Sequence, residues 1–394
     1  MANATLQAKS VSGQGGAPQP AVATAFRSQT QPTIKRPGLA LTAVVAATPT
    51  PLADTQIPPT TLLRCIYLEV TCVTAGNAAT VAFQPDAPLN ALSTINFHDA
   101  QGTSIVGSFD SFTMSMAQKW FGFTNNADPS QSAVYSVTAG VGGGLGGSFT
   151  IVYRIPVEVV NRTGVGAQIN TDTQSPLVMS LAVNSTGAIY STAPTAAGTV
   201  TVVISYGGYW NQSGNTMSFP TPTAVGSLNY VNFTTYPGLT GAQQFQLANI
   251  GLGNQVLNIL FINRLTAGAR SDTAFPNPLQ VAYRGNVLGS WSELLWKHMM
   301  SEAYDYGNPL TDAGIGANAG TPTTGATGLN LGVYNLWFNA DFVFQPGNTL
   351  FYGMLNTAVG DSVELTGSWS AGSTLTELIN FLAVNGPVSA IQGH

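Results

Sequence analysis

Charged residues are the scarcest feature of this sequence. Only 12 Lys/Arg and 17 Asp/Glu occur among its 394 residues, or 7%, whereas a typical soluble domain carries about 25% charged residues. A free monomer of this size normally depends on charged side chains to stay soluble and to hold off its neighbours. A surface of Gly, Ala, Thr, Ser, Asn and Gln instead suits a protein that is mostly covered by copies of itself.

Histidine and cysteine are also rare. The three histidines have no metal-motif spacing, and two cysteines alone cannot form a Cys-based zinc site. Cys65 and Cys72 lie seven residues apart in a run that reads as a β-strand, so their side chains should point to opposite faces. We therefore expect two buried thiols and no disulfide, as in a protein that folds in a reducing compartment.

Motifs for catalysis and cofactor binding are missing as well. The chain contains no G-x-S-x-G and no Walker A sequence. Residues 142–147 fit G-x-G-x-x-G but precede a strand, so we interpret them as a loop. His98 and Asp99 are adjacent at a strand end and are interpreted as a turn pair. The sequence predicts no enzyme activity, no cofactor and no metal site.

Long apolar runs are absent too. None approaches the roughly 18 residues that cross a bilayer. The first residues, MANAT, lack the apolar segment of a secretory signal peptide. Residues 39–47 (LALTAVVAA) resemble such a segment, but they start too far into the chain and are followed by Pro and Asp. We interpret them as a buried extended segment.

The few charges are unevenly distributed. Residues 1–53 contain four basic residues, Lys9, Arg27, Lys35 and Arg36, and no acidic one, whereas the rest of the chain is acidic. A basic arm on an acidic body favours contact with an anionic partner: nucleic acid, lipid headgroups or an acidic neighbour. The alternative is a tail with incidental charges. The arginines of the body are too dispersed for sequence-specific nucleic-acid recognition.

Most of the chain after residue 60 has the pattern of β-strands. These segments are β-branched or alternating and are bounded by turn residues. They are residues 62–73, 78–83, 93–98, 148–160, 177–183, 199–206, 243–251, 255–263, 279–284, 333–344, 349–355 and 362–369. Pro156 lies inside the fourth of them and predicts an edge, a bulge or a break there.

Two clear helices and one weaker candidate are predicted. Residues 290–304 start at Ser290, with Glu293 as its capping-box partner. Their apolar face comprises Trp291, Leu294, Leu295, His298 and Met299, and Glu293 and Lys297 form an i,i+4 pair. Residues 375–384 have a capping box of Thr374 and Glu377, and Asn385-Gly386-Pro387 ends the helix. The weaker candidate is residues 111–120.

These patterns divide the chain into three parts. Residues 1–55 form an N-terminal arm without periodicity, 56–210 a first β domain, and 211–394 a second β domain with a C-terminal helix. A polar, proline-containing stretch at 210–237 marks the boundary between the domains. The predicted fold class is all-β: two antiparallel eight-stranded jelly rolls in one chain, with short helices and an extended arm.

The order of several segments is familiar. Residues 62–102 give a long hydrophobic strand, a Gly/Asn turn, a second strand, the segment PLNAL and a short strand that ends in an Asp-containing turn. GSFTIVYRIPVEVV, QVLNILFINR, LQVAYRGN, SWSELLWKHMMSEAYDYG and GVYNLWFNADFVF follow. In this order they resemble the tectivirus-type major capsid protein, a member of the double jelly-roll lineage that includes the adenovirus hexon.

The resemblance implies a structural protein. Two upright jelly rolls would lie side by side in one chain, and three chains would form a pseudo-hexagonal capsomer of an icosahedral shell. Residues 124–147 and 307–331 would be outer loops. The implied partners are a homotrimer, neighbouring capsomers and, through the inward-facing arm, internal membrane lipid or minor capsid proteins. The protein would be made in the host cytoplasm and reside in the virion capsid. The alternative is a secreted or surface β-sandwich adhesin or lectin, which would have a cleaved N-terminus.

Overall fold

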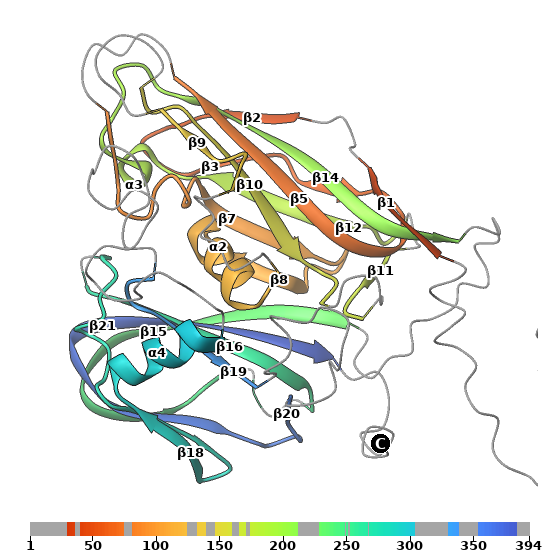
Figure 1. Cartoon of the computed structure of the whole chain (residues 1–394). Helices are drawn as coiled ribbons and strands as arrows, with labels where there is room; N and C mark the ends of the chain where they lie inside the picture. Colours follow the sequence, from red (N-terminus) through yellow and green to blue (C-terminus); the bar gives the residue numbers. More distant parts are fainter. Residues whose placement is uncertain are drawn as a thin grey trace, which may run out of the picture.

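The structure is a computed structural model dominated by antiparallel strands (Figure 1). It describes residues 30–35, 40–74, 81–123, 132–138, 146–159, 165–170, 174–211, 228–248, 250, 253–266, 268–303, 330–338 and 354–383. The predicted all-β class is confirmed. The strands fall into a first half, up to residue 211, and a second half, from residue 228, which lie one above the other in Figure 1.

The first half contains two sheets around one core. One sheet has the order β1/β2–β14–β5–β10, and the other β3/β4–β12–β7–β8. The strands are β1 (Thr30–Lys35), β2 (Ala40–Val44), β3 (Thr50–Pro51), β4 (Thr55–Ile57), β5 (Thr61–Val73), β7 (Leu92–His98), β8 (Ser104–Phe109), β10 (Phe149–Pro156), β12 (Leu177–Val183) and β14 (Thr199–Asn211). Helix α2 (Ser111–Trp120) follows β8 and precedes β9 (Ser136–Val137) and β10 in the chain. This strand order is that of a jelly roll.

Smaller elements complete the first half. They are β6 (Ala82–Phe83), which pairs with β13 (Tyr190–Thr192), β9 (Ser136–Val137) beside β10, β11 (Gln168–Asn170) beside β5, and the one-turn helix α3 (Thr186–Ile189).

The second half repeats the same strand order with two long, bent strands. Its elements are β15 (Leu228–Gln246), β16 (Gln255–Arg264), β17 (Leu279–Tyr283), β18 (Asn286–Trp291), α4 (Glu293–Ala303), β19 (Val333–Trp337), β20 (Leu355–Asn356) and β21 (Val363–Ala383). β15 and β21 pair along their lengths, with register shifts between Tyr236 and Gly241. On one side of the shift the order is β15–β21–β16–β19, and on the other β15–β21–β17–β18. Helix α4 follows β18 and precedes β19, as α2 follows β8 and precedes β9 and β10.

Alternating burial explains why the strands of the first half could be predicted from the sequence. In β12 every second residue is buried and the intervening ones are half-buried, so the period-two pattern is visible. β10 alternates in the same way and ends at Pro156, which has no backbone N–H to donate. These strands and α2 confirm the predictions for residues 177–183, 148–160 and 111–120.

The predicted C-terminal helix is wrong. Residues 375–383 are the last part of β21, which pairs with β15 on one side and β16 on the other. Leu378 through Leu382 are all buried because both faces of this sheet are covered. A strand buried on both faces reads as a continuous apolar run, which periodicity cannot distinguish from a buried helix.

The predicted start and face of the other helix are also corrected. α4 begins at Glu293, and Ser292, not Ser290, caps it by accepting a hydrogen bond from Leu295 N at 3.3 Å. Its buried side chains are Trp296, Lys297 and Met300, whereas Leu294 and Leu295 of the predicted apolar face are exposed. The buried face of α4 was hard to identify from the sequence because it includes Lys297, and lysine is rarely buried unless it is paired.

The N-terminal arm is shorter than predicted. β1 and β2 form the edge of one sheet of the first half, and β3 and β4 form the edge of the other. The interpretation of residues 39–47 as a buried extended segment holds only in part. The described residues begin with the strand β2, but only Leu41 and Val45 are buried, and Val44 is exposed. The predicted boundary stretch at 210–237 is likewise partly strand, because β14 ends at Asn211 and β15 begins at Leu228.

Both cysteines are buried free thiols, as expected. Cys72 belongs to the main core and its Sγ lies 3.7 Å from the Tyr190 hydroxyl. Burial raises the pKa of the Cys72 thiol to about 11, and burial also raises that of Cys65. Thiols with raised pKa values react slowly, consistent with a packing role.

Candidate functional site

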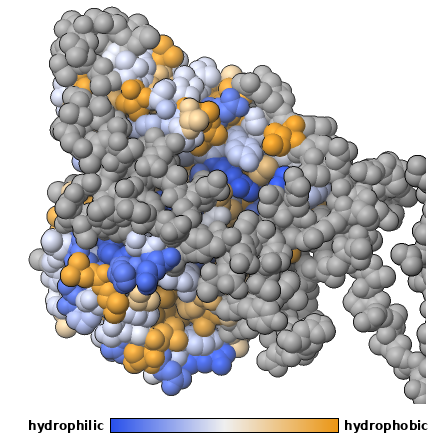
Figure 2. Space-filling model, in the orientation of Figure 1, coloured by the Kyte–Doolittle hydropathy of each residue, from blue (hydrophilic) through white to orange (hydrophobic). Residues whose placement is uncertain are grey.

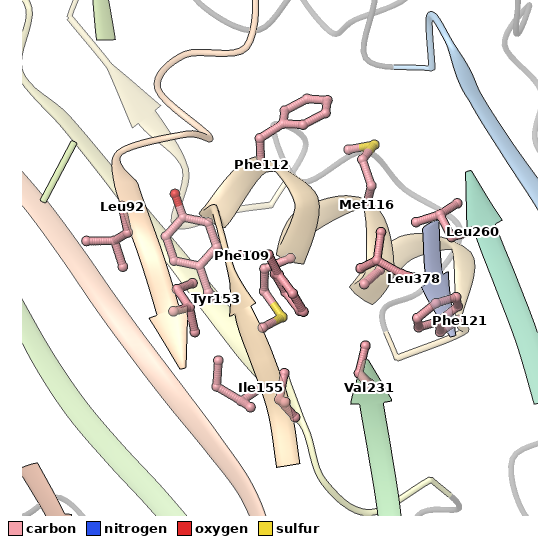
Figure 3. Close-up of a cluster of buried hydrophobic side chains, with 14 of the residues drawn as sticks. Leu92, Phe109, Phe112, Met116, Phe121, Tyr153, Ile155, Val231, Leu260 and Leu378 are labelled. Atoms are coloured by element: carbon pink, nitrogen blue, oxygen red, sulfur yellow. The ribbon is translucent and has the colours of Figure 1, made fainter. Parts of the chain in front are cut away.

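The junction between the two halves combines ion pairs, hydrogen bonds and apolar packing. At its centre is α2, all ten of whose residues are buried. Asp110 caps the helix, accepting a hydrogen bond from Thr113 N at 2.7 Å. Figure 3 shows α2 lying between Tyr153 and Ile155 of the first half and Leu260 and Leu378 of the second. A helix that is buried on all sides connects the two halves instead of covering one of them.

A charged cluster spans this junction. Asp86, from the first half, accepts a hydrogen bond from Arg270 Nε and pairs with Arg264 Nη1 of the second half, both at 2.7 Å. Both guanidinium groups lie over the ring of Phe112 in α2, with the Arg270 centre 4.4 Å from the ring centroid. Burial by itself would raise the pKa of Asp86, but Arg270 and Arg264 hold it below its ordinary value.

A second polar connection lies at the end of α2. Lys119 Nζ donates to Asn330 Oδ1 at 2.7 Å, and Asn335 Nδ2 donates to the Trp120 carbonyl at 3.1 Å. Asn330 also accepts at its carbonyl from Lys297 Nζ of α4 at 2.6 Å. The residue pair Lys119–Asn330 therefore joins the helix of one half to the helix of the other.

Lys297 also forms a buried ion pair with Asp272. Its Nζ lies 3.1 Å from Asp272 Oδ1, which also accepts from Gly332 N and from the Tyr334 hydroxyl. Burial lowers the pKa of Lys297, and Asp272 counteracts that effect. Lys297 is fully buried and also donates to the carbonyls of Asn330 and Val333. A buried polar network of this kind fixes the positions of the segments that it joins.

Of the four predicted site residues, the structure describes only Lys35. Lys35 is the last residue of β1, where its backbone pairs with Tyr206. Lys9, Arg27 and Arg36 lie outside the described residues. The proposed anion-facing role of these four residues stays a prediction.

Other sequence features have ordinary structural roles where they are described. His98 Nε2 contacts Ser180 Oγ at 3.1 Å, and Asp99 accepts from the backbone of Gln101 and Thr103 in the turn after β7. The turn-pair interpretation is confirmed. Of the glycine-rich motif at 142–147, only Gly146 and Gly147 are described, and most of the predicted outer loops at 124–147 and 307–331 also lies outside the described residues.

The described part of the chain holds no group of three or more His, Cys, Asp or Glu that could bind a metal ion. In the same residues, no helix has the length and apolar character to cross a membrane. Sequence reasoning did not single out the junction residues Asp86, Arg264 and Arg270, because isolated charges in a strand or helix carry no motif. Lys297 was predicted only as the i,i+4 partner of Glu293.

Comparison with solved structures identifies the fold. The chain is similar to the STIV major capsid protein, with 12% identity, a TM-score of 0.56, and 89% of this chain and 97% of that chain covered. It is also similar to a chain in the atomic structure of Sulfolobus turreted icosahedral virus, with 12% identity and a TM-score of 0.57 over 92% and 96%. The PBCV-1 virus capsid matches with 10% identity and a TM-score of 0.53 over 91% and 97%.

No protein-family model matches the chain, and no curated protein matches its sequence. The matched structures are double jelly-roll capsid proteins. The double jelly-roll fold implied by the sequence resemblance is therefore confirmed, and it covers both halves of the chain.

Proposed function

We propose that this chain is the major capsid protein of an icosahedral virus, and that three copies form a pseudo-hexagonal capsomer. The observation that carries the proposal is the extent of the structural match. Both jelly rolls align with those of viral capsid proteins, and the alignment covers most of this chain and most of each matched chain. The scarcity of charge supports it independently, because neutral surfaces lose little solvation when neighbouring copies cover them.

The proposal includes the organisation and location of the chain. The two jelly rolls correspond to residues 56–210 and 211–394, with β1 to β4 completing the first, and the protein is a structural component of the virion shell. Neighbouring capsomers are its further partners. The contacts between the two halves support this role. Arg270 pairs with Asp86, and Lys119 donates to Asn330, and such contacts hold the two jelly rolls of a capsid subunit in one orientation.

The oligomeric state and shape test the proposal. We expect the purified protein to have three times the mass of one 40.9 kDa chain by light scattering at micromolar concentration. Negative-stain images should show three-fold particles with a hexagonal outline. A stable 40.9 kDa monomer under these conditions would contradict the proposed capsomer.

We also propose that the N-terminal arm contacts an anionic partner inside the shell, either internal membrane lipid or a minor capsid protein. Lys9, Arg27, Lys35 and Arg36 are the residues for this contact, and no acidic residue lies among them. Because β1 begins at Thr30 and pairs with β14, a deletion that tests the arm alone should stop before residue 30.

Deleting residues 2–29 is expected to leave the trimer mass unchanged and to reduce the yield of closed shells, because the strands of both jelly rolls are retained. Replacing Lys9, Arg27, Lys35 and Arg36 with Gln should also reduce the yield of closed shells if the positive charge of the arm is what promotes assembly. Electron microscopy and sedimentation of expressed particles measure the yield. Normal particles from both variants would refute the role of the arm.

A further inference from the structure

Helix α4 directs one lysine away from the surface. Figure 2 shows hydrophilic residues gathered over α4 on the visible face of the second half. The side chains of His298 and Glu302 on this helix are 66% and 70% exposed, whereas the side chain of Lys297 is only 3% exposed. Burying an amine costs free energy, because its charged form loses contact with water. A lysine that points inward from a surface helix therefore calls for an explanation.

Aromatic rings surround the buried amine. Lys297 Nζ lies 4.3 Å from the centroid of the Tyr334 ring. That ring stacks on Phe275, with 3.8 Å between the centroids, and meets Trp296 edge-on at 5.6 Å. All three aromatic side chains are buried. Water is therefore kept away from the amine and from the groups that it contacts.

The contacts of Lys297 Nζ match those of a neutral amine. It donates to the carbonyls of Asn330 at 2.6 Å and Val333 at 3.0 Å, and its third contact is Asp272 Oδ1 at 3.1 Å. A neutral amine has two N–H groups and one lone pair, so with both hydrogens on the carbonyls its lone pair faces the Asp272 carboxyl. Burial lowers the pKa of Lys297, and Asp272 acts in the opposite direction. A lowered pKa favours the nucleophilic form of the amine.

The two oxygens of the Asp272 carboxyl have different surroundings. Oδ1 accepts hydrogen bonds from Gly332 N at 2.6 Å and from the Tyr334 hydroxyl at 2.9 Å. Oδ2 is buried and has no hydrogen-bond partner among the described residues. Most buried polar atoms in proteins have a partner, so an orphaned carboxylate oxygen needs a reason. An oxygen that leaves the molecule needs no partner.

We propose that Lys297 Nζ and Asp272 Cγ become joined by an amide between the two side chains, an isopeptide bond, after the chain has folded. In this bond Oδ1 remains as the amide oxygen, with Gly332 and Tyr334 as its donors, and Oδ2 is lost as water. The bond needs only the folded second half, so it does not depend on the proposed capsid function.

The reaction is a condensation that needs no external reagent. One proton passes from the Lys297 ammonium to Asp272 Oδ2, which converts the ion pair into an amine and a carboxylic acid. The amine attacks Cγ, and the Gly332 N–H and the Tyr334 hydroxyl stabilise the negative charge that develops on Oδ1. The Cγ–Oδ2 bond then breaks, and Oδ2 leaves as water with its own proton and one amine proton. Nothing is oxidised or reduced.

The fold supplies the driving force. Reacting groups that are held in contact behave as if their concentration were about 10⁵ M or more, which favours condensation. The surrounding aromatic rings exclude the water that would reverse it. The product would fasten α4 to the segment between β16 and β17, beside the contact of Lys119 with Asn330 at the junction of the two halves. Unlike a disulfide, such a link forms without an oxidant.

The mass of the intact, denatured chain tests the bond. We expect wild type to be lighter than its sequence by one water molecule. Lys297→Arg keeps the positive charge but cannot form the amide, so it should have its full mass, as should Asp272→Ala. Asp272→Asn should reach the same mass as linked wild type, because ammonia leaves in place of water. The wild-type mass decides the question by itself, even if a variant fails to fold.

Peptide mapping locates the link. Trypsin cleaves after Arg270 and Arg284, so residues 271–284 should be found attached to a peptide that contains Lys297, where trypsin no longer cleaves. A wild-type chain of full mass overturns the inference. Loss of water without linked peptides, as from a succinimide, also overturns it, and so does loss of ammonia with a link between Lys119 and Asn330. Trimers of full-mass chains would refute the bond alone, whereas linked monomers would refute the capsomer alone.

Discussion

Asp86→Ala is expected to lower the free energy of unfolding by about 3–5 kcal/mol. Asp86 is the carboxylate between Arg264 and Arg270, whose side chains are 22% and 2% exposed. Without it, both guanidinium groups remain over Phe112 but lose the carboxylate that they share. A buried charge that has lost its partner costs far more than the pair contributes, so truncation of the shared anion has a large effect.

Guanidinium chloride unfolding at one fixed protein concentration measures this loss, since association of copies adds to apparent stability. Glu302→Ala is the control, because Glu302 and His298 form a pair at 3.6 Å in which both side chains are mostly exposed. Such pairs contribute about 0–1 kcal/mol. Asp86→Asn keeps an acceptor oxygen and should fall between the two. If Asp86→Ala changed stability no more than Glu302→Ala, the junction would not depend on this cluster.

Sequence patterns identified most of the framework because the strands of the first half have one face in the core and the other outside it. β12 and β7 alternate in burial, and the predictions for them match within a residue. α2, predicted only as a weaker candidate, has the predicted bounds in the structure, where Asp110 caps it. The strand end at Pro156 follows from the missing N–H.

The same reasoning failed where both faces of an element are covered. The last part of β21 looks helical because Thr374 and Glu377 have capping-box spacing. In the structure, Thr374 pairs with Arg264 and Glu377 with Phe261 across the β16 ladder. The helical propensity of this segment is overridden by its place in the sheet, which only the tertiary fold defines.

The junction itself could not be predicted from single residues. Asp86, Arg264 and Lys119 are distant in sequence and have no characteristic neighbours, yet they meet at α2. Lys297 was predicted to form an i,i+4 pair with Glu293, whereas in the structure it is buried and contacts Asp272 and the Asn330 carbonyl. In a chain with so few charges, a better guide is that charges retained in apolar segments are often paired across the fold.

Glu377→Gln is expected to make the protein more stable at pH 8.5 and to leave its stability almost unchanged at pH 5. Glu377 is fully buried in β21 and accepts a hydrogen bond from the Tyr236 hydroxyl at 2.6 Å. Its Oε1 has no hydrogen-bond partner among the described residues. Burial raises the pKa of the Glu377 carboxyl to about 8, and the hydrogen bond from Tyr236 only partly offsets that effect.

The direction of the pH dependence follows from where the proton is bound. Between about pH 4.5, the ordinary pKa, and about pH 8, the folded protein keeps a proton on Glu377 that the unfolded chain has released. Stability therefore falls as pH rises through this window and levels off above it. With about 1.36 kcal/mol per pKa unit, the loss by pH 8.5 is on the order of a few kcal/mol. Gln cannot ionise, so the variant avoids this loss.

Unfolding of wild type and Glu377→Gln at pH 5, 6.5, 8 and 8.5 measures the difference between their slopes. Glu364→Gln is the matched control, because Glu364 lies on the same strand, bonds to Gln244 at an exposed position and changes the net charge equally. It should preserve the wild-type slope. Parallel curves for wild type and Glu377→Gln would show that Glu377 is already ionised in the folded protein. If the slopes differ, whole shells should also lose stability at mildly alkaline pH, because the same buried carboxyl is present in every copy.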